Sequence, residues 1–380
     1  MEQKLFSKTW IAVFAALTAI GIGFWIYQLI NGLQVTGMGN TNSWGIYIIM
    51  FMFFVGLSAG GLIVASSGHV FNIEKFKKVA LPAVICSTVC IVLAALFVLV
   101  DLGGFVRVWR LLTNPNFASP LMWDVAVITI YLVLNILDII WMRKGDEKKV
   151  KVLSCIALPT AIMVHTVTAW IFGLQIGRTW YTAVMGPIFV ASAMDSGLAL
   201  LLLALLLLEA RNLFQTGKTL FKSLAGLLAT FIAVDFYLII CELLTMGYPE
   251  AGDAAAFAVM TSGATAPYFW FEMICGILIP FIILVIPKNR EKKSMIILAS
   301  VLVVLGVFCK RVWLLLTAFA APYLAGNATL TDAFATAAGT FGGIGALYSP
   351  TLVEILIVLG VLSLGVLAFM LLSNKLLGKK

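Results

Sequence analysis

The feature that most constrains this chain is a series of ten long apolar stretches. Each holds about 20 residues with few charges, which is the length that an α-helix needs to cross the hydrocarbon core of a bilayer. Because that core offers backbone groups no water, such stretches must be helical. The sequence therefore predicts an all-α polytopic membrane protein with about ten transmembrane helices. They lie at roughly 9–30, 44–71, 79–101, 119–142, 152–175, 184–210, 223–247, 266–287, 294–317 and 350–373.

Composition supports a membrane protein and argues against other classes. Of the 380 residues, 62% are hydrophobic and 11% are charged, whereas a soluble domain carries about 25% charged residues. The net charge of +8 does not indicate nucleic-acid binding, because Lys and Arg lie in short runs between the apolar stretches. The six cysteines lie inside the stretches without a CxxC pair, so we expect neither zinc nor an iron–sulfur cluster in this chain.

The basic residues predict how the chain lies in the membrane. Most of the 25 Lys and Arg fall in the termini and in alternate loops, whereas loops 31–43, 248–265 and 318–349 contain none. By the positive-inside rule, both termini are expected in the cytoplasm. We expect one integral membrane domain over residues 1–380. In it, the second to fifth helices (about 44–175) and the sixth to ninth (about 184–317) form two four-helix bundles with two peripheral helices.

Ionisable side chains inside the apolar stretches are costly, so they mark candidate sites. Only Asp138 and Glu209 lie in the inner half, which favours a one-sided site over a path across the membrane. One alternative is structural, in which Lys310 or Arg311 neutralises acids of neighbouring helices. The other is a proton path formed by Asp124, Asp195, Asp235, Glu242, Glu272 and Arg311.

His165 lies near the middle of the fifth stretch. An imidazole exchanges protons near neutral pH, so His165 is a candidate catalytic residue. The alternative is a hydrogen bond between helices. His69 lies at the inner end of the second stretch and is interpreted as an interfacial polar residue. Because the two histidines differ in depth, they cannot readily supply the axial pair of a b-type haem, and we expect no haem.

Aromatic side chains gather at the outer ends of the stretches, as in the aromatic belt of membrane proteins. Trp109 and Trp123 flank the acidic residues Asp101 and Asp124, so one of these tryptophans could also line a ligand pocket. The short segment 105–112 between them is amphipathic. It is expected to lie along the outer interface rather than cross the membrane.

Several of these motifs resemble one family. Trp44-Gly45, Ala59-Gly60-Gly61 and Asp101-Leu102-Gly103 resemble the NrfD / polysulfide reductase membrane-subunit (PsrC) family. The later chain resembles its ten-helix branch, which looks like the membrane subunit of HybB-type hydrogenases, and the likeness covers about 44–360. The motifs that carry it further are Arg107, Trp109, Ser119-Pro120, Trp123, His165-Thr166, Trp170, Gln175, Arg178 and Tyr348-Ser349-Pro350-Thr351. Gly104-Phe105 depart from the Arg-Pro that often follows the Asp-Leu-Gly motif.

The resemblance implies a haem-free quinone-binding subunit of a respiratory oxidoreductase complex in the cell membrane. It would exchange electrons between menaquinone or ubiquinone and a ferredoxin-like iron–sulfur subunit on the outer face. That subunit would in turn serve a molybdopterin or other catalytic subunit. Proton transfer could accompany this exchange. A proton-coupled secondary transporter and an inert membrane anchor are the alternatives.

The resemblance also implies roles for individual residues. His165 would hydrogen-bond one quinone oxygen, and Asp101 would exchange protons with the outer phase through Asp124. Both His165 and Asp101 are thus expected to be catalytic. Further candidate quinone contacts are Trp44, Tyr47, Trp109, Trp123 and Arg178.

Overall fold

The computed structural model describes residues 5–39, 42–104, 106, 108–174, 179–248, 253–320 and 348–378. All regular elements in these ranges are helical, and ten helices are long and apolar enough to cross a membrane. They are α1 Lys8–Asn31, α2 Ile46–Val70, α4 Ala80–Asp101, α6 Pro120–Lys144, α7 Glu147–Gly173, α8 Met185–Ala210, α9 Lys218–Met246, the composite span Ala266–Val285, α13 Lys293–Ala320 and α15 Leu352–Leu377. The prediction of an all-α, multi-pass integral membrane protein is confirmed.

The composite span and the connections contain shorter helical elements. The span Ala266–Val285 joins α11, a π-helical segment η3, and α12. The short elements are η1 Leu33–Val35, α3 Glu74–Lys77, α5 Arg110–Thr113, α10 Ala254–Thr261, α11 Ala266–Phe271, η3 Glu272–Leu278, α12 Ile279–Val285 and η4 Asn289–Glu291.

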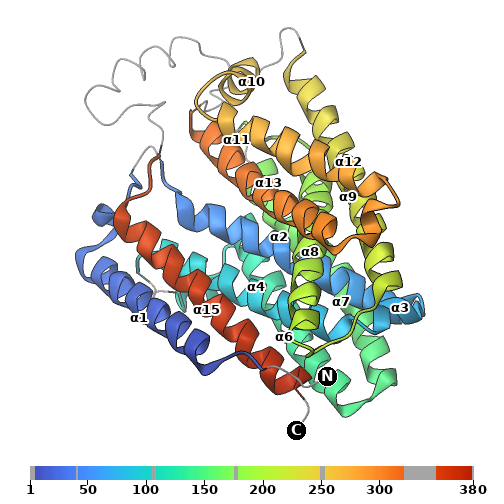
Figure 1. Cartoon of the computed structure of the whole chain (residues 1–380). Helices are drawn as coiled ribbons and strands as arrows, with labels where there is room; N and C mark the ends of the chain where they lie inside the picture. Colours follow the sequence, from blue (N-terminus) through green and yellow to red (C-terminus); the bar gives the residue numbers. More distant parts are fainter. Residues whose placement is uncertain are drawn as a thin grey trace, which may run out of the picture.

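The spans cross in alternating directions and so give the molecule two ends. Both termini lie at one end (Figure 1), where the backbone N–H of Phe6 donates a hydrogen bond of 3.0 Å to Asn374 Oδ1. The loops at this end carry most of the basic residues, and it is termed the basic end. The other is termed the opposite end. That the basic end faces the cytoplasm stays a prediction of the positive-inside rule.

Local sequence explains where α6 begins and how it turns into α7. Pro120 stands in the first turn of α6, where a missing N–H costs nothing. Gly145 ends the helix in the left-handed conformation with φ 71°. Asp146 then caps α7 by accepting a hydrogen bond of 3.2 Å from the backbone N–H of Lys149. The two helices therefore form a close antiparallel hairpin.

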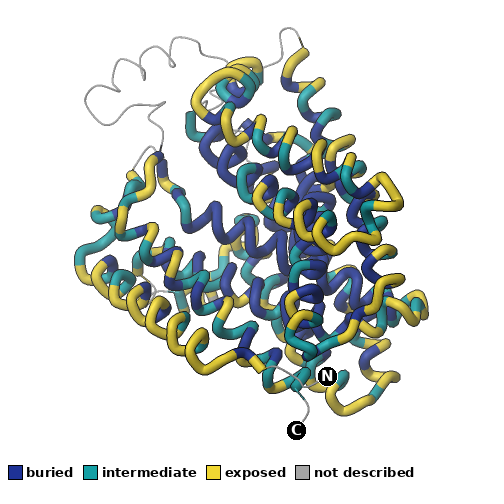
Figure 2. Tube along the Cα trace, in the orientation of Figure 1, coloured by how far each residue is buried: buried dark blue, intermediate teal, exposed yellow. Residues whose placement is uncertain are grey.

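Helix α2 is the centre of the fold. It packs on α4, α7, α8 and α13, and the most apolar 18-residue window of α2 is 100% buried, against 11% for α1. Figure 2 shows this contrast along the two helices. The close approach depends on small residues, because a Cβ on Gly60 would lie only 2.6 Å from Cα of Gly197 on α8. The small-residue run of α2 thus serves helix packing.

The other contacts close two rings of helices. Helices α2, α4, α6 and α7 form one ring, termed the first bundle, and α8, α9, α12 and α13 form the other, termed the second bundle. Helices α1 and α15 pair beside the first bundle, where α15 packs on α4 (Figure 1). The assignment of a quinone site to the first bundle stays a prediction.

Candidate functional site

One polar cluster lies at the opposite end, where α1, α2 and α4 meet. Tyr47 is fully buried and donates a hydrogen bond of 2.6 Å to Gln28 Oε1. Gln28 Nε2 donates in turn to the carbonyl of Val100, at 3.1 Å. The next residue, Asp101, is close enough to Tyr47 to interact electrostatically. The structure thus brings together two predicted site residues, Tyr47 and Asp101.

Glu354, at the start of α15, joins this cluster to the loop between α1 and α2. It is fully buried, and its Oε2 accepts hydrogen bonds of 2.8 Å from the backbone N–H groups of Gly37 and Thr351. Tyr348 donates to Oε1 at 2.5 Å. Burial raises the pKa of Tyr348, so its hydroxyl keeps the proton that it donates. The group of Gln28, Tyr47, Tyr348 and Glu354 is termed the rim network.

His165 of α7 and Arg311 of α13 form a second cluster, where both helices pack on α2 and α8. His165 is 1% exposed, its Nε2 has no hydrogen-bond partner among the described residues, and it interacts electrostatically with Arg311. Arg311 is 0% exposed. Its Nη2 donates to Ser192 Oγ at 2.6 Å, and its Cζ lies 4.2 Å from the ring centroid of Phe189.

Two further donors of Arg311, Nε and Nη1, have no partner in the part of the chain that the structure describes. Gly56 of α2 lies beside this guanidinium, since a Cβ there would be in ordinary van der Waals contact with Nη2, at 3.6 Å. His165 and Arg311 are termed the junction pair. Buried polar groups are nearly always hydrogen-bonded, so the junction pair is the part of the core that most requires a further polar group.

Asp124 lies in the same part of the first bundle as His165. Thr168 Oγ1 donates a hydrogen bond of 2.6 Å to Asp124 Oδ1 across the α6–α7 hairpin. Thr168 is three residues after His165 on α7, so both project from one helix face. Asp124 therefore lies about one turn nearer to the opposite end than His165 does.

The second bundle contains a buried group of charges centred on Lys310. Its Nζ lies 2.9 and 2.8 Å from the two carboxylate oxygens of Asp235, and 3.5 Å from Glu272 Oε1. Trp313 Nε1 donates to the other oxygen of Glu272 at 2.5 Å. This ion pair between Lys310 and Glu272 is one of the pairings that the structural alternative allowed.

Two other predicted acids lie near this group. Asp195 is buried and interacts electrostatically with Asp235 and Lys310. Glu242 accepts a hydrogen bond of 3.1 Å from Thr182 Oγ1. A cavity of about 20 Å³, room for about one water molecule, is lined by both Glu242 and Lys310. Glu272 itself begins the π-helical segment η3, and such segments are frequent at functional sites.

Two of the remaining predicted contacts lie apart from both clusters, and one lies outside the described residues. Trp109 and Trp123 are 57% and 48% exposed, as an aromatic belt requires. Trp44 packs edge-on against Phe172, with 5.8 Å between ring centroids. Trp44 is connected to the junction pair, because its neighbour Phe172 stacks on Phe189, the ring beside Arg311. Arg178, with Gln175 and Arg107, lies outside the described residues.

The structure does not gather Asp101 and His165 into one cluster. Asp101 interacts with Glu354, whereas His165 interacts with Arg311. Sequence reasoning also missed Gln28, whose amide joins α1 to both α2 and α4. The signal was available, because Gln28 and Asn31 are the only side-chain amides in α1.

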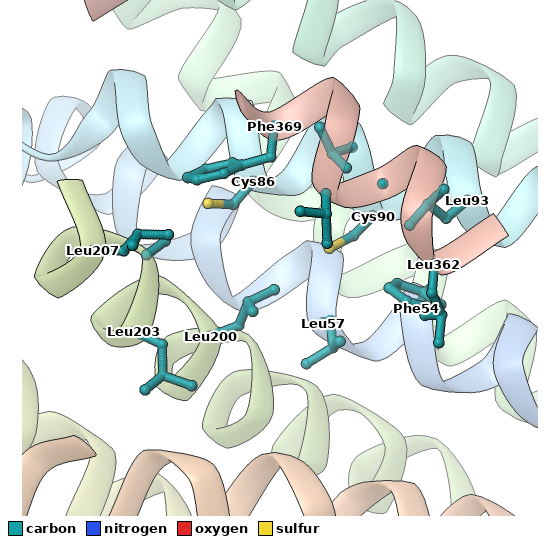
Figure 3. A pocket seen from close by; sticks show the side chains of 14 residues that line it. Phe54, Leu57, Cys86, Cys90, Leu93, Leu200, Leu203, Leu207, Leu362 and Phe369 are labelled. Atoms are coloured by element: carbon teal, nitrogen blue, oxygen red, sulfur yellow. The ribbon is translucent and has the colours of Figure 1, made fainter. Parts of the chain in front are cut away.

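A cavity of about 470 Å³ lies between α2, α4, α8 and α15. Figure 3 shows Phe54, Leu200 and Phe369 on its walls, with the sulfurs of Cys86 and Cys90. Its lining is otherwise aliphatic or aromatic. Such a groove suits a hydrocarbon chain, and it lacks the hydrogen-bonding groups that a redox head group needs.

Comparison with known proteins decides the family. The model of the family described as "Polysulphide reductase, NrfD" matches residues 34–322. The chain belongs to the NrfD family. It is similar to a putative dimethyl sulfoxide reductase membrane subunit of Halobacterium salinarum, with 35% identity over 96% of this chain and 89% of the relative. The resemblance expected from the sequence is confirmed, and the cell membrane is the usual place for such subunits.

Other relatives carry related names. A selenate reductase subunit of Mesobacillus selenatarsenatis is 27% identical over 96% of this chain and 93% of its own length. The "Hdr-like menaquinol oxidoreductase integral membrane subunit" of Archaeoglobus fulgidus is 29% identical over 94% and 90%. A "Probable Ni/Fe-hydrogenase 2 b-type cytochrome subunit" of Escherichia coli is 25% identical over 83% of each chain.

Proposed function

We propose that this chain is the quinone-reactive membrane subunit of a respiratory oxidoreductase complex. It exchanges electrons between the quinone pool and an iron–sulfur partner subunit at the opposite end, which serves a molybdopterin or other catalytic subunit. Membership of the NrfD family and the menaquinol-linked name of the Archaeoglobus relative support this role. The observation that carries this proposal is the junction pair. In it, His165 Nε2 and the Nε and Nη1 atoms of Arg311 are buried without a described hydrogen-bond partner.

The junction pair suits a quinone head group. A guanidinium only donates hydrogen bonds, whereas a neutral imidazole has one donor and one acceptor nitrogen. Together they can donate to a quinone carbonyl and accept from a quinol hydroxyl. Ser192 and Phe189 hold the guanidinium in place. The fixed positive charge of Arg311 therefore favours negative charge that develops on the oxygen during reduction.

We assign the next proton position to Asp124, because its partner Thr168 lies one turn beyond His165. Asp101 then exchanges protons with the aqueous phase at the rim, as the sequence predicted, although it belongs to a different cluster. In the second bundle, Asp195, Asp235, Glu242, Glu272 and Arg311 stay candidates for a proton path, and the cavity beside Lys310 supports that role.

We keep the expectation that the chain binds no haem, although one Escherichia coli relative is named a b-type cytochrome subunit. His69 is the last residue but one of α2 at the basic end, whereas His165 lies in the half of α7 nearer the opposite end. Paired axial ligation needs two histidines at one depth. Electrons would therefore pass directly between the quinone and a cluster of the partner subunit.

The test is a fluorescence titration of the purified chain with a quinol-analogue inhibitor. His165→Ala is expected to weaken binding at least tenfold, which is about 1.4 kcal/mol. The matched control is His69→Ala, which removes the other imidazole at the far end of the first bundle. Equal affinity of His165→Ala and the unaltered chain would remove the site from the junction pair. No saturable binding by the folded chain would favour an anchor or a transporter.

A further inference from the structure

The half of the first bundle nearer the basic end holds buried polar groups that the proposed quinone site does not use. Tyr131 of α6 is 0% exposed. Its hydroxyl lies 2.8 Å from Ser87 Oγ on α4 and 3.0 Å from the carbonyl of Ser58 on α2. One turn further along α6, Asn135 donates to the carbonyl of Tyr131 at 2.9 Å, while its Oδ1 is buried without a partner in the described ranges.

Asp138 is the member of this group whose burial without partners is most costly. It is 0% exposed, and neither carboxyl oxygen has a hydrogen-bond partner among the residues described. Ser154 Oγ of α7 is buried and unpartnered in the same way. Asp138 lies seven residues before Gly145 and Ser154 lies eight residues after Asp146. In an antiparallel hairpin, these positions are at the same depth.

The polar groups continue to the basic end along α2. Ser66 Oγ is buried without a described partner, and three residues later the half-buried His69 has an unpartnered Nε2. His69 is close enough to Glu147, at the start of α7, to interact electrostatically. His69 lies eleven residues, or about three turns, after Ser58, and Ser66 lies within one turn of His69, so the three project from one side of α2.

Toward the opposite end, the same face of α6 leads to the junction pair. Asp124, Tyr131, Asn135 and Asp138 are all buried and are spaced seven, four and three residues apart. The hydrogen bond between Thr168 and Asp124 sets the register of the hairpin, so His165 lies about four residues beyond the depth of Tyr131. At 1.5 Å per residue, this is a separation of about 6 Å along the membrane normal.

Polar atoms that are buried without partners are costly, and native proteins satisfy them with internal water. Here such atoms recur on three helices from mid-membrane to the basic end, and the carboxyl, hydroxyl and imidazole groups among them can each pass a proton. Chains of this kind inside a membrane mark proton relays. If these side chains served only to pair helices, we would expect each polar atom to be hydrogen-bonded to a neighbouring helix.

We propose that this half of the first bundle is a water-filled proton path that leads from the basic end, through His69, Asp138 and Tyr131, to His165. The hydration of the path stands by itself, whereas its end point at His165 rests on the proposed function. For each electron that a quinone oxygen accepts, one proton enters from water at the basic end and becomes the proton of the hydroxyl. This path serves proton uptake during quinone reduction, whereas Asp124 and Asp101 serve proton release toward the opposite end during quinol oxidation. With electrons arriving at the opposite end, uptake from the basic end moves charge across the membrane.

Thiol labelling tests the hydration without any quinone. In a chain whose six native cysteines are replaced by alanine, single cysteines are introduced and treated in membranes with 2-aminoethyl methanethiosulfonate, which reacts with thiolates in water. The matched pair is Ser154→Cys and Ala225→Cys, since each is the eighth residue of its helix and each is buried. We expect Ser154→Cys to react at least tenfold faster. Equal, slow reaction would overturn the water-filled path.

Reduction of a soluble naphthoquinone by the whole complex tests the proton transfer. Asp138→Asn is expected to slow turnover at least tenfold with unchanged affinity for the quinol analogue, and Asp138→Glu to restore most of it. Asp146→Asn, at the α6–α7 turn, is the control and keeps the full rate. Labelled Ser154→Cys together with full turnover of Asp138→Asn would overturn the role of Asp138. Failure of the proposed quinone site would appear separately, as loss of analogue binding in the unaltered chain.

Discussion

The rim network and the junction pair are both buried, polar and close to the opposite end, yet they differ in how their atoms are satisfied. In the rim network, Glu354 accepts hydrogen bonds from three residues and Tyr47 is paired with Gln28. In the junction pair, His165 and Arg311 keep three nitrogen atoms without a described partner. A satisfied network holds helices together, whereas an unsatisfied one requires a ligand or water.

This difference separates two kinds of variant. Changes in satisfied clusters should lower the free energy of unfolding and leave quinone affinity alone. Changes in the junction pair should lower quinone affinity and have a smaller effect on the free energy of unfolding. The Lys310 group of the second bundle is closer to the satisfied clusters, because both of its acids contact a donor. Only Glu272 Oε1 lacks a described hydrogen bond, and it still forms an ion pair of 3.5 Å with Lys310.

The largest effect is expected from Lys310→Met. Removing the cation leaves Asp235 and Glu272 buried beside one another, so the free energy of unfolding should fall by about 3–5 kcal/mol. Thermal unfolding in detergent measures it, with the exposed Lys292→Met as the control. An unaltered unfolding temperature would show that Lys310 is not the cation that these carboxylates need.

Arg311→Met removes the charge and donors of the junction pair with little change in volume. Quinol-analogue affinity should fall about a hundredfold, or about 2.8 kcal/mol. Stability should fall by less than in Lys310→Met. The bond to Ser192 and a positive charge near Asp195, Asp235 and Glu272 are lost, but two unpartnered donors also leave the core. Titration with the quinol analogue and thermal unfolding of the same sample measure the effects on affinity and on stability separately. A large loss of stability with unchanged affinity would assign Arg311 to packing.

Glu354→Gln tests the rim network. The amide cannot accept as strongly as the carboxylate, so stability should fall by roughly 1.5–3 kcal/mol, the worth of hydrogen bonds to a charged group. Analogue affinity should stay within twofold. If affinity fell tenfold or more while the chain stayed folded, the quinone site would extend to the rim.

Tyr47→Phe should have the smallest effect. It removes one hydrogen bond, to Gln28, and should cost roughly 1 kcal/mol of stability. Tyr47 was a predicted quinone contact, but its hydroxyl is already paired with Gln28. We therefore expect Tyr47→Phe to leave quinol-analogue affinity unchanged. Weaker analogue binding by Tyr47→Phe, with stability intact, would restore Tyr47 as a contact.

The spans were predictable because apolar length is a property of the sequence alone. The first span was expected at residues 9–30 and is the helix Lys8–Asn31 in the structure. The fifth was expected at 152–175 and is the helix Glu147–Gly173. The latter helix begins earlier than expected because Glu147 and its basic neighbours add a solvated turn that hydropathy does not detect.

The site was less predictable because pairing depends on how helices face one another. The sequence identified Lys310 and Arg311 as adjacent cations, but not that one is paired with Asp235 while the other contacts Ser192. Counting only charged groups also predicted a one-sided site. The structure adds Asn135 and Ser154, whose uncharged polar side chains become informative because they are buried without a described partner.

The most direct test of the quinone site is photo-crosslinking of the complex with an azido-quinone, followed by peptide mapping. This account predicts labelled peptides from α7 and α13 around His165 and Arg311, and their loss in Arg311→Met. Labelling confined to α1, α2 and α15 around the rim network, and unaffected by Arg311→Met, would contradict it.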